Sequence, residues 1–168
     1  MKSILYSLMF LILSSTAISA CAQNGKPSPA TTTTGKVGNA TITINYGAPS
    51  VKGRKIWGEL VPYGKVWRTG ANDATTFKID QDVLIEGKSL PKGEYALFTI
   101  PEAKEWTIIF SKNAKQWGAY SYKQEDDALR VNVKPTASSS FTETLKFDVT
   151  GGKVLLKWEN TEVGFKVN

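Results

Sequence analysis

The fold is decided by the stretch at residues 40–47, Ala40-Thr41-Ile42-Thr43-Ile44-Asn45-Tyr46-Gly47. Apolar and polar side chains alternate along it, so that Ile42, Ile44 and Tyr46 share one face of an extended chain. Successive side chains of a β-strand point to opposite faces of its sheet. The stretch therefore predicts a strand with one buried face and one face in water.

The same period of two returns at residues 76–80, 129–134 and 162–167. Residues 95–100 and 106–110 are instead apolar on both faces, which is typical of central strands. Turn-forming residues separate these segments, namely Glu86-Gly87-Lys88, Pro91-Lys92-Gly93, Gly151-Gly152 and Asn160-Thr161. We therefore expect an all-β fold, a single antiparallel β-sandwich or jelly-roll-like domain of nine or ten short strands, with a barrel as the alternative.

Residues 1–20 have the composition of a secretory signal peptide. Lys2 precedes an apolar run at residues 4–13, and small residues follow. The run is too short to span a bilayer, so we expect export. Ile18-Ser19-Ala20-Cys21 resembles the bacterial lipobox, which predicts a lipid anchor on Cys21 and a place in the periplasm or outer membrane. The alternative is ordinary cleavage near Ala22, which would give a soluble periplasmic or secreted protein.

A polar segment separates this signal from the alternating region. Residues 21–34 contain no large apolar side chain, so burial cannot offset the cost of ordering them, and we expect a flexible tether. Residues 35–168 leave 134 positions, which is enough for one domain with a hydrophobic core.

The composition narrows the possible functions. The chain has no histidine, and Cys21 is its only cysteine, so the usual proton shuttle and thiol chemistry are missing from the domain. Because phosphate-binding loops, zinc helices and nucleophile elbows are also missing from the sequence, we expect no cofactor, no metal site and no catalytic residue. The net charge of +6 comes mostly from scattered lysines, so nucleic acid is not an expected partner. A hydrolase that uses paired carboxylates stays open, since 15 acidic residues are present.

One long segment, residues 47–73, breaks the strand pattern. It is rich in glycine and proline, yet it carries several large apolar side chains, so we expect an ordered excursion with a functional role. Three motifs lie within it: Pro49-Ser50-Val51-Lys52-Gly53-Arg54-Lys55-Ile56-Trp57-Gly58, Leu60-Val61-Pro62-Tyr63-Gly64 and Val66-Trp67-Arg68-Thr69-Gly70-Ala71-Asn72.

These motifs resemble the DUF2911 family of exported Bacteroidetes proteins. The resemblance continues through residues 91–101, 106–110 and 116–120, and so extends over nearly all of the expected domain. It implies export and a single domain. Because the family has no established activity, the resemblance implies no catalytic residues.

The third motif contains the largest number of side chains suited to binding a ligand. Arg68 is a planar donor fork suited to carboxylates or phosphates, Trp67 offers a stacking face, and Asn72 both donates and accepts hydrogen bonds. Together they could orient a sugar, a peptide terminus or an anionic headgroup. In the alternative, purely structural interpretation, Trp67 fills the core and Arg68 pairs with Asp73 or Glu59.

The full candidate ligand site consists of Arg54, Tyr63, Trp67, Arg68, Asn72, Trp117 and Tyr120. Trp106 alternates in phase with its apolar neighbours and is expected in the core. The run at residues 125–127 lacks the spacing of a calcium loop and is expected to be a solvated turn. Glu143 alternates in step with Phe141 and Leu145, which would place its carboxylate on the buried side of a strand. Either the strand starts later, or the carboxylate has a partner such as Lys or Arg.

Three functions follow from these observations. The first is a non-catalytic binding module for a glycan, a peptide or a lipid headgroup. The second is a structural lipoprotein that interacts with another envelope protein, and the third is a carboxylate-dependent hydrolase. A concave pocket that contains Arg68 would favour the first, a flat exposed apolar patch the second, and two facing carboxylates in a cleft the third.

Overall fold

The structure is a computed structural model that describes residues 28–168. The predicted signal peptide, Cys21 and the tether up to residue 27 lie outside the described residues. The strands are β1 (Ala30–Val37), β2 (Ala40–Gly47), β3 (Thr75–Ile79), β4 (Val83–Ile85), β5 (Lys88–Leu90), β6 (Gly93–Ile100), β7 (Trp106–Ser111), β8 (Asp127–Val133), β9 (Thr136–Thr150) and β10 (Lys153–Lys166). A single 3-10 turn, η1 (Gln124–Asp126), precedes β8 within the described part of the chain.

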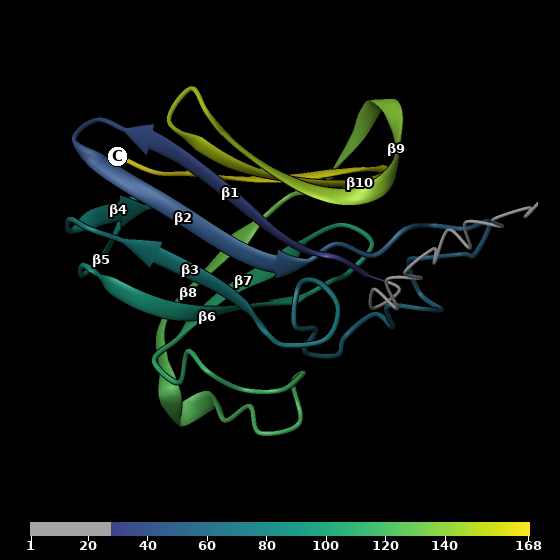
Figure 1. The fold of residues 1–168 in the computed structure, drawn as a ribbon, viewed down its shortest axis with the longest axis horizontal. Coiled ribbons are helices and arrows are strands. Elements are labelled where there is room, and N and C mark those ends of the chain that lie inside the picture. The colour runs from purple at the N-terminus through teal and green to yellow at the C-terminus, as the bar shows by residue number, and fades with distance from the viewer. Residues whose placement is uncertain (1–27) are drawn as a thin grey trace, which may run out of the picture.

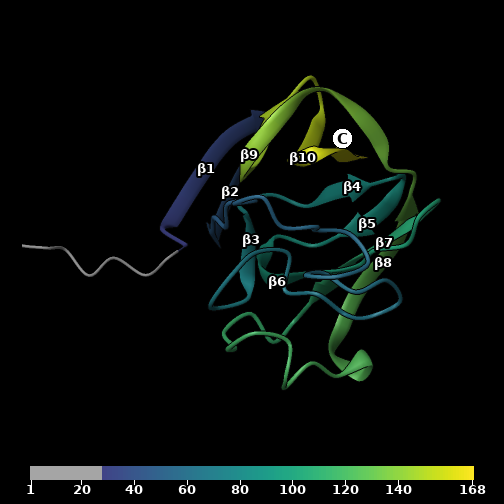
Figure 2. The same cartoon turned by 90° about the vertical axis from the view of Figure 1, so that its right-hand side faces the viewer.

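Ten antiparallel strands form three sheets, which confirms the all-β prediction. Six of them form one sheet in the order β1-β2-β3-β6-β7-β8, while β9 pairs with β10 and β4 pairs with β5. The long β9–β10 hairpin arches over one face of the large sheet, with β4 and β5 beside it (Figures 1 and 2). The fold is therefore a sandwich of a large sheet and a hairpin layer. Within residues 28–168, no helix has the length and apolar character needed to cross a membrane.

The hairpin layer is tied to the large sheet on one side and to the β4–β5 sheet on the other. On the β1 side, the Thr33 hydroxyl donates to the Phe147 carbonyl at 3.1 Å, and the Phe147 amide donates to the Tyr46 hydroxyl at 3.3 Å. On the other side, Leu84 and Asn168 exchange backbone hydrogen bonds of 2.7 and 3.0 Å. These contacts close the sandwich around a single main core.

The core follows the alternation in the sequence. The inward residues of β2 and β3 include Ile42, Ile44 and Phe77, each fully buried. At one end of the core lies a tryptophan cluster, which we define as Trp57, Trp67, Trp106 and Trp158, with neighbouring ring centroids 4.9–6.4 Å apart. Trp106 is 2% exposed, which confirms its predicted core position. Edge-to-face contacts between aromatic rings stabilise the fold beyond the contribution of the buried area alone.

The other face of the large sheet is covered by the irregular segment between β7 and β8. Phe98 and Tyr122 pack edge to face at 5.1 Å. Tyr122 donates to Asp127 Oδ2 at 2.9 Å and also contacts the Arg130 guanidinium, and burial raises the pKa of Tyr122. The side chain of Asp127 is 9% exposed and accepts a 2.5 Å hydrogen bond from Arg130 Nε. The prediction of a solvated turn at residues 125–127 is therefore wrong for Asp127, which anchors this second packing layer.

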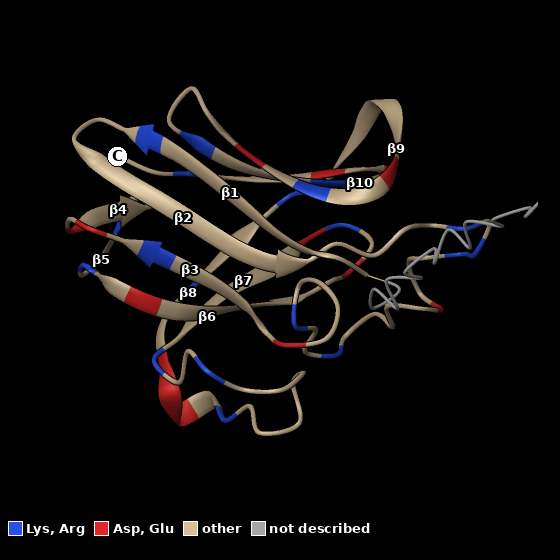
Figure 3. Cartoon of the chain, viewed as in Figure 1, with Lys and Arg blue, Asp and Glu red and all other residues tan. Residues whose placement is uncertain are grey.

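Charged residues are distributed over strands and loops alike. Figure 3 shows Lys and Arg in both kinds of segment, with Asp and Glu between them. Some of them form ion pairs, and Lys157 Nζ lies 3.3 Å from carboxylate oxygens of both Asp148 and Glu162. This distribution agrees with the scattered lysines of the sequence.

Two boundaries and the environment of Glu143 differ from the sequence prediction. The tether is predicted to run to residue 34, but β1 already begins at Ala30, because its threonines pair with β2. Asn160-Thr161 does not form a turn, because β10 continues through these residues. The pairing register shifts on both sides of Glu159, where φ is 56° and the strand bulges. Glu143 is exposed although β9 starts early, and its carboxylate accepts from the Lys52 backbone amide at 2.9 Å rather than from a basic side chain.

Candidate ligand-binding site

The segment between β2 and β3 is ordered and lies against one end of the sandwich. Its first half carries Ile56 and Val61 into the core, with exposed fractions of 0% and 2%. Its second half adds a short antiparallel pair beside β6, in which Trp67 and Thr99 exchange backbone hydrogen bonds of 2.7 and 2.9 Å. The excursion predicted from glycine, proline and aromatic content is therefore folded onto the sheet.

A tight turn at residues 69–72 shapes the surface beside Arg68. Thr69 is 1% exposed with φ of 55°, and Asn72 has φ of 65°. The Thr75 hydroxyl donates to the Thr69 carbonyl at 2.9 Å, which holds the turn from inside. A Cβ on Gly70 would lie 2.9 Å from both the Gly47 carbonyl oxygen and Thr75 Oγ1. Only glycine fits this close approach without a shift of the backbone.

This turn forms one wall of a hollow of about 270 Å³, which we call the arginine hollow. The residues that line it are Ser28, Pro49, Arg54, Leu60, Val61, Trp67, Arg68, Gly70, Ala71, Asn72 and Trp158. None of these lining residues is acidic. Four of the seven residues predicted for the ligand site come together here, namely Arg54, Trp67, Arg68 and Asn72.

The two arginines differ in how they are held. Arg54 is fixed by the backbone, since its Nε donates to the Val51 carbonyl at 3.0 Å and its Nη2 to the Ser50 carbonyl at 2.5 Å. Arg68 Nε is buried and has no hydrogen-bond partner among the described residues. The predicted pairing of Arg68 with Asp73 or Glu59 is absent from the ion pairs of residues 28–168, and Glu59 instead pairs with Lys55 at 3.0 Å.

Trp158 presents a second donor that lacks an acceptor. Its ring is 1% exposed and lines the hollow, and its indole N–H has no hydrogen-bond partner in the described part of the chain. The ring of Trp67 stacks on that of Trp158 with centroids 5.9 Å apart, and its own N–H donates to the Gly70 carbonyl at 3.2 Å. Trp67 is 9% exposed, so it serves mainly as core packing and only its remaining surface reaches the hollow.

Asn72 marks the border of the hollow. Its Nδ2 donates to the Ser28 carbonyl at 3.1 Å, which ties the start of the described chain to the turn. The amide oxygen of Asn72 carries no hydrogen bond among the described residues and can accept one from a ligand.

Three predicted residues lie elsewhere. Tyr63 is 42% exposed and Tyr120 is 86% exposed, and neither lines the hollow. Trp117 is 54% exposed and lines a neighbouring hollow of about 340 Å³ together with Asp73. The predicted site is thus divided: four residues gather at the arginine hollow, Trp117 lines the neighbouring hollow, and Tyr63 and Tyr120 line neither. Sequence reasoning missed Trp158, because its position in a strand pattern indicates only burial.

The described domain matches a known protein family over almost its whole length. The family model DUF2911, described as a protein of unknown function, matches residues 28–167. The chain belongs to the DUF2911 family. No curated protein and no solved structure matches it. The function of this DUF2911 domain is therefore inferred from the geometry of its own surface.

Two carboxylates of the DUF2911 domain share a hollow, and both are already held by other groups. Glu86 and Glu162 line one hollow of about 320 Å³ that also contains three lysines. Each carboxylate already has a partner: Glu86 accepts from the Lys166 backbone amide at 2.6 Å, and Glu162 lies 3.3 Å from Lys157 Nζ. Within residues 28–168, no cluster of three potential metal ligands occurs. The arginine hollow has the more distinctive chemistry.

Proposed function

We propose that this DUF2911 protein is a non-catalytic binding module that holds an anionic group of its ligand in the arginine hollow. The observation that carries the proposal concerns Arg68, which lines a hollow without acidic lining residues and whose buried Nε has no hydrogen-bond partner among residues 28–168. Arg54 brings a second guanidinium to the same hollow. Guanidinium groups bind carboxylate, phosphate and sulfate through charge-assisted hydrogen bonds.

An anion would satisfy donors that the folded chain leaves unused. A buried donor without an acceptor costs about 1–3 kcal/mol, and this cost is relieved when a ligand oxygen accepts from it. Arg68 Nε and the Trp158 indole N–H are both in this state. Arg54 is already held by two backbone carbonyls, so little side-chain freedom is lost when it binds. Both atoms are closed to solvent in the unbound domain, so a ligand oxygen reaches them only after a side-chain movement opens them to the hollow.

The test is anion binding followed through tryptophan fluorescence, since Trp67 and Trp158 line the hollow. Sulfate, phosphate and acetate are titrated at constant ionic strength into the chain at residues 22–168, which keeps the terminal amino group away from Ser28 and the hollow. At least one anion is expected to change the emission, and Arg68→Gln is expected to weaken its binding at least tenfold, because it removes the charge and the buried donor. Lys78→Gln is the matched control, since it removes one positive charge from an exposed site in β3. Equal binding by the two variants, or no binding by the wild type, would contradict the proposal.

Export and a lipid anchor on Cys21 complete the proposal. They are supported by the signal-like residues 1–20 and the lipobox-like Ile18-Ser19-Ala20-Cys21. Ser28, which lines the hollow, follows Cys21 by seven positions, and a fully extended chain spans at most about 25 Å over that length. An anchored protein would therefore present the hollow close to the membrane surface.

Mass spectrometry of the membrane fraction tests this anchor. The wild type is expected to sediment with membranes and to carry diacylglycerol and acyl groups on an N-terminal Cys21. Cys21→Ser is expected to lose the lipid and its membrane association. A soluble wild type whose N-terminus lies after Cys21 would show instead that ordinary signal peptidase removes the cysteine.

A further inference from the structure

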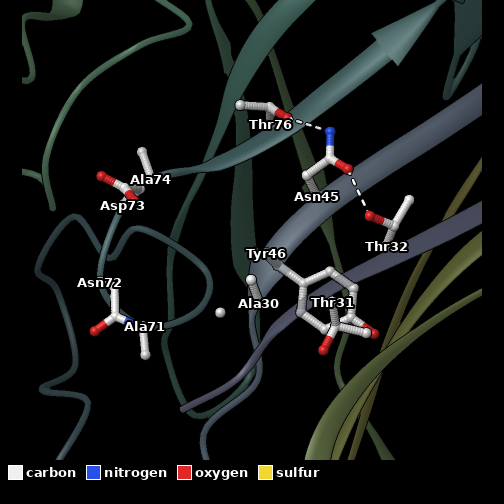
Figure 4. A pocket seen from close by; sticks show the side chains of 11 residues that line it. Ala30, Thr31, Thr32, Asn45, Tyr46, Ala71, Asn72, Asp73, Ala74 and Thr76 are labelled. Carbon is white, nitrogen blue, oxygen red and sulfur yellow. Dashed lines mark hydrogen bonds between the residues drawn. The ribbon is translucent and has the colours of Figure 1, made fainter. Parts of the chain in front are cut away.

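A second hollow adjoins the arginine hollow, and we call it the threonine groove. It has a volume of about 310 Å³ and is lined by Ala30, Thr31, Thr32, Asn45, Tyr46, Gly47, Ala71, Asn72, Asp73, Ala74 and Thr76 (Figure 4). Ala71 and Asn72 line both hollows, so the two meet at this pair. The groove is built from β1, β2, β3 and the turn that precedes β3.

Side chains on three neighbouring strands form a hydrogen-bonded row along this groove. Thr32, Asn45 and Thr76 are cross-strand partners on β1, β2 and β3. The Thr32 hydroxyl donates to Asn45 Oδ1 at 2.8 Å, and Asn45 Nδ2 donates to Thr76 Oγ1 at 3.2 Å (Figure 4).

The direction of these bonds decides what the row offers to a ligand. Thr32 has used its proton, so its oxygen is left to accept. Thr76 has accepted, so its proton is left to donate, and Asn45 keeps a second N–H. Donors and acceptors thus alternate within a few ångströms. A hydroxyl group, which both donates and accepts, matches this pattern better than an anion or an apolar chain does.

The groove continues toward an exposed aromatic ring. Asp73, Ala74 and Thr76 also line the hollow of about 340 Å³ that contains Trp117. Trp117 is 54% exposed, and such a ring offers an apolar face to the C–H groups of a sugar. Gln116 lines the same hollow and has a buried side-chain oxygen without a hydrogen-bond partner among the described residues. A side-chain movement that opens this oxygen to the hollow would let it accept a hydrogen bond from a ligand hydroxyl.

We infer that the ligand is an acidic oligosaccharide, with its anionic group in the arginine hollow and its neutral sugar units along the threonine groove to Trp117. This inference rests on the proposed function for the position of the anionic group. The hydroxyl-matched row, the exposed indole and the unsatisfied Gln116 oxygen are independent of it. A lipid acyl chain forms no hydrogen bonds with these polar groups, which favours a glycan over an acyl chain in the groove.

The experiment starts from an array of acidic and neutral oligosaccharides, probed with residues 22–168. The best-bound acidic oligosaccharide and its isolated acidic monosaccharide are then compared by isothermal titration. The oligosaccharide is expected to bind at least tenfold more tightly than the monosaccharide, because its neutral units occupy the groove. Trp117→Ala and Asn45→Ala are expected to remove this advantage without changing the affinity for the monosaccharide.

Two variants serve as matched controls. Tyr120→Ala removes an aromatic ring that is 86% exposed and lines neither hollow. Asn132→Ala removes another cross-strand asparagine, which accepts from Thr107 at 3.2 Å and donates to Glu105 at 3.0 Å at the opposite edge of the large sheet. Both are expected to bind the oligosaccharide as the wild type does.

The outcomes separate this inference from the proposed function. If oligosaccharide and monosaccharide bind equally, or if Trp117→Ala behaves like Tyr120→Ala, the oligosaccharide inference is wrong, while binding that depends on Arg68 keeps the anion site. If no array member binds but phosphatidylglycerol vesicles bind through Arg68, the ligand is a lipid headgroup and the inference is again wrong. If Arg68→Gln changes no anion affinity, the proposed function itself fails.

Discussion

Trp106→Ala is expected to lower the free energy of unfolding by about 3–5 kcal/mol, the range for loss of a large aromatic side chain from a packed core. Trp106 is 2% exposed, and its ring lies 4.9 Å from that of Trp57 and 6.4 Å from that of Trp67. Alanine would leave a cavity between the large sheet and the excursion that forms the arginine hollow. Equilibrium unfolding in urea, followed by circular dichroism, measures the loss.

Tyr120→Ala is the control for this prediction. Its ring is 86% exposed, so its removal is expected to change the free energy of unfolding by less than about 0.5 kcal/mol. A loss below about 1 kcal/mol for Trp106→Ala would mean that the tryptophan cluster relaxes around the missing ring. The cluster would then not be the rigid support of the hollow that the ring contacts indicate.

The strands were predictable because their signal is local. In β2, one-residue alternation assigns each side chain to a face, and burial of Ile42 and Ile44 follows from that alone. Gly151-Gly152 likewise predicted the β9–β10 hairpin, since both glycines adopt positive φ in the turn. The contacts between the two layers were not predictable, because β1 and β9 meet only through tertiary packing between segments far apart in the sequence.

The errors have the same origin. The polarity of residues 30–34 suggested a tether, although these residues are stabilised by pairing with β2 rather than by burial of their own side chains. Asn160-Thr161 has turn chemistry, but β9 is long enough to pair on both sides of it, so the chain bulges instead of reversing. In both cases a nonlocal ladder of hydrogen bonds outweighs local propensity.

The candidate site was predictable where its residues lie within the single excursion at residues 47–73, which also contributes Arg54. Trp67, Arg68 and Asn72 fall within one motif, and the structure places all three at the arginine hollow. The threonine groove combines β1, β2 and β3, so its row of side chains exists only once the sheet has formed. Its sequence signal, polar residues on the wet face of strands, is the same as that of any solvated sheet.

Gly47→Ala is expected to destabilise the domain by about 3 kcal/mol, at the upper end of the range for overpacking. A Cβ on Gly47 would lie 2.2 Å from the Ala71 carbonyl oxygen and 2.9 Å from the Ala71 carbonyl carbon. These are backbone atoms, and the Ala71 amide also donates to the Gly47 carbonyl at 3.1 Å, so the turn at residues 69–72 must move as a unit. Urea unfolding measures the loss of stability.

The same displacement should reach both binding surfaces, because Ala71 and Asn72 line the arginine hollow and the threonine groove. Gly47→Ala is therefore expected to weaken ligand binding even at temperatures where the variant is fully folded. Gly38→Ala is the matched control: its Cβ would meet nothing within 4 Å, and only its φ of 56° costs about 1 kcal/mol. Equal stability of the two variants, or unchanged anion binding by folded Gly47→Ala, would show that the turn yields without disturbing the site. If Gly47→Ala weakens binding and Gly38→Ala does not, the contact between Gly47 and the turn is needed to hold the shape of both hollows.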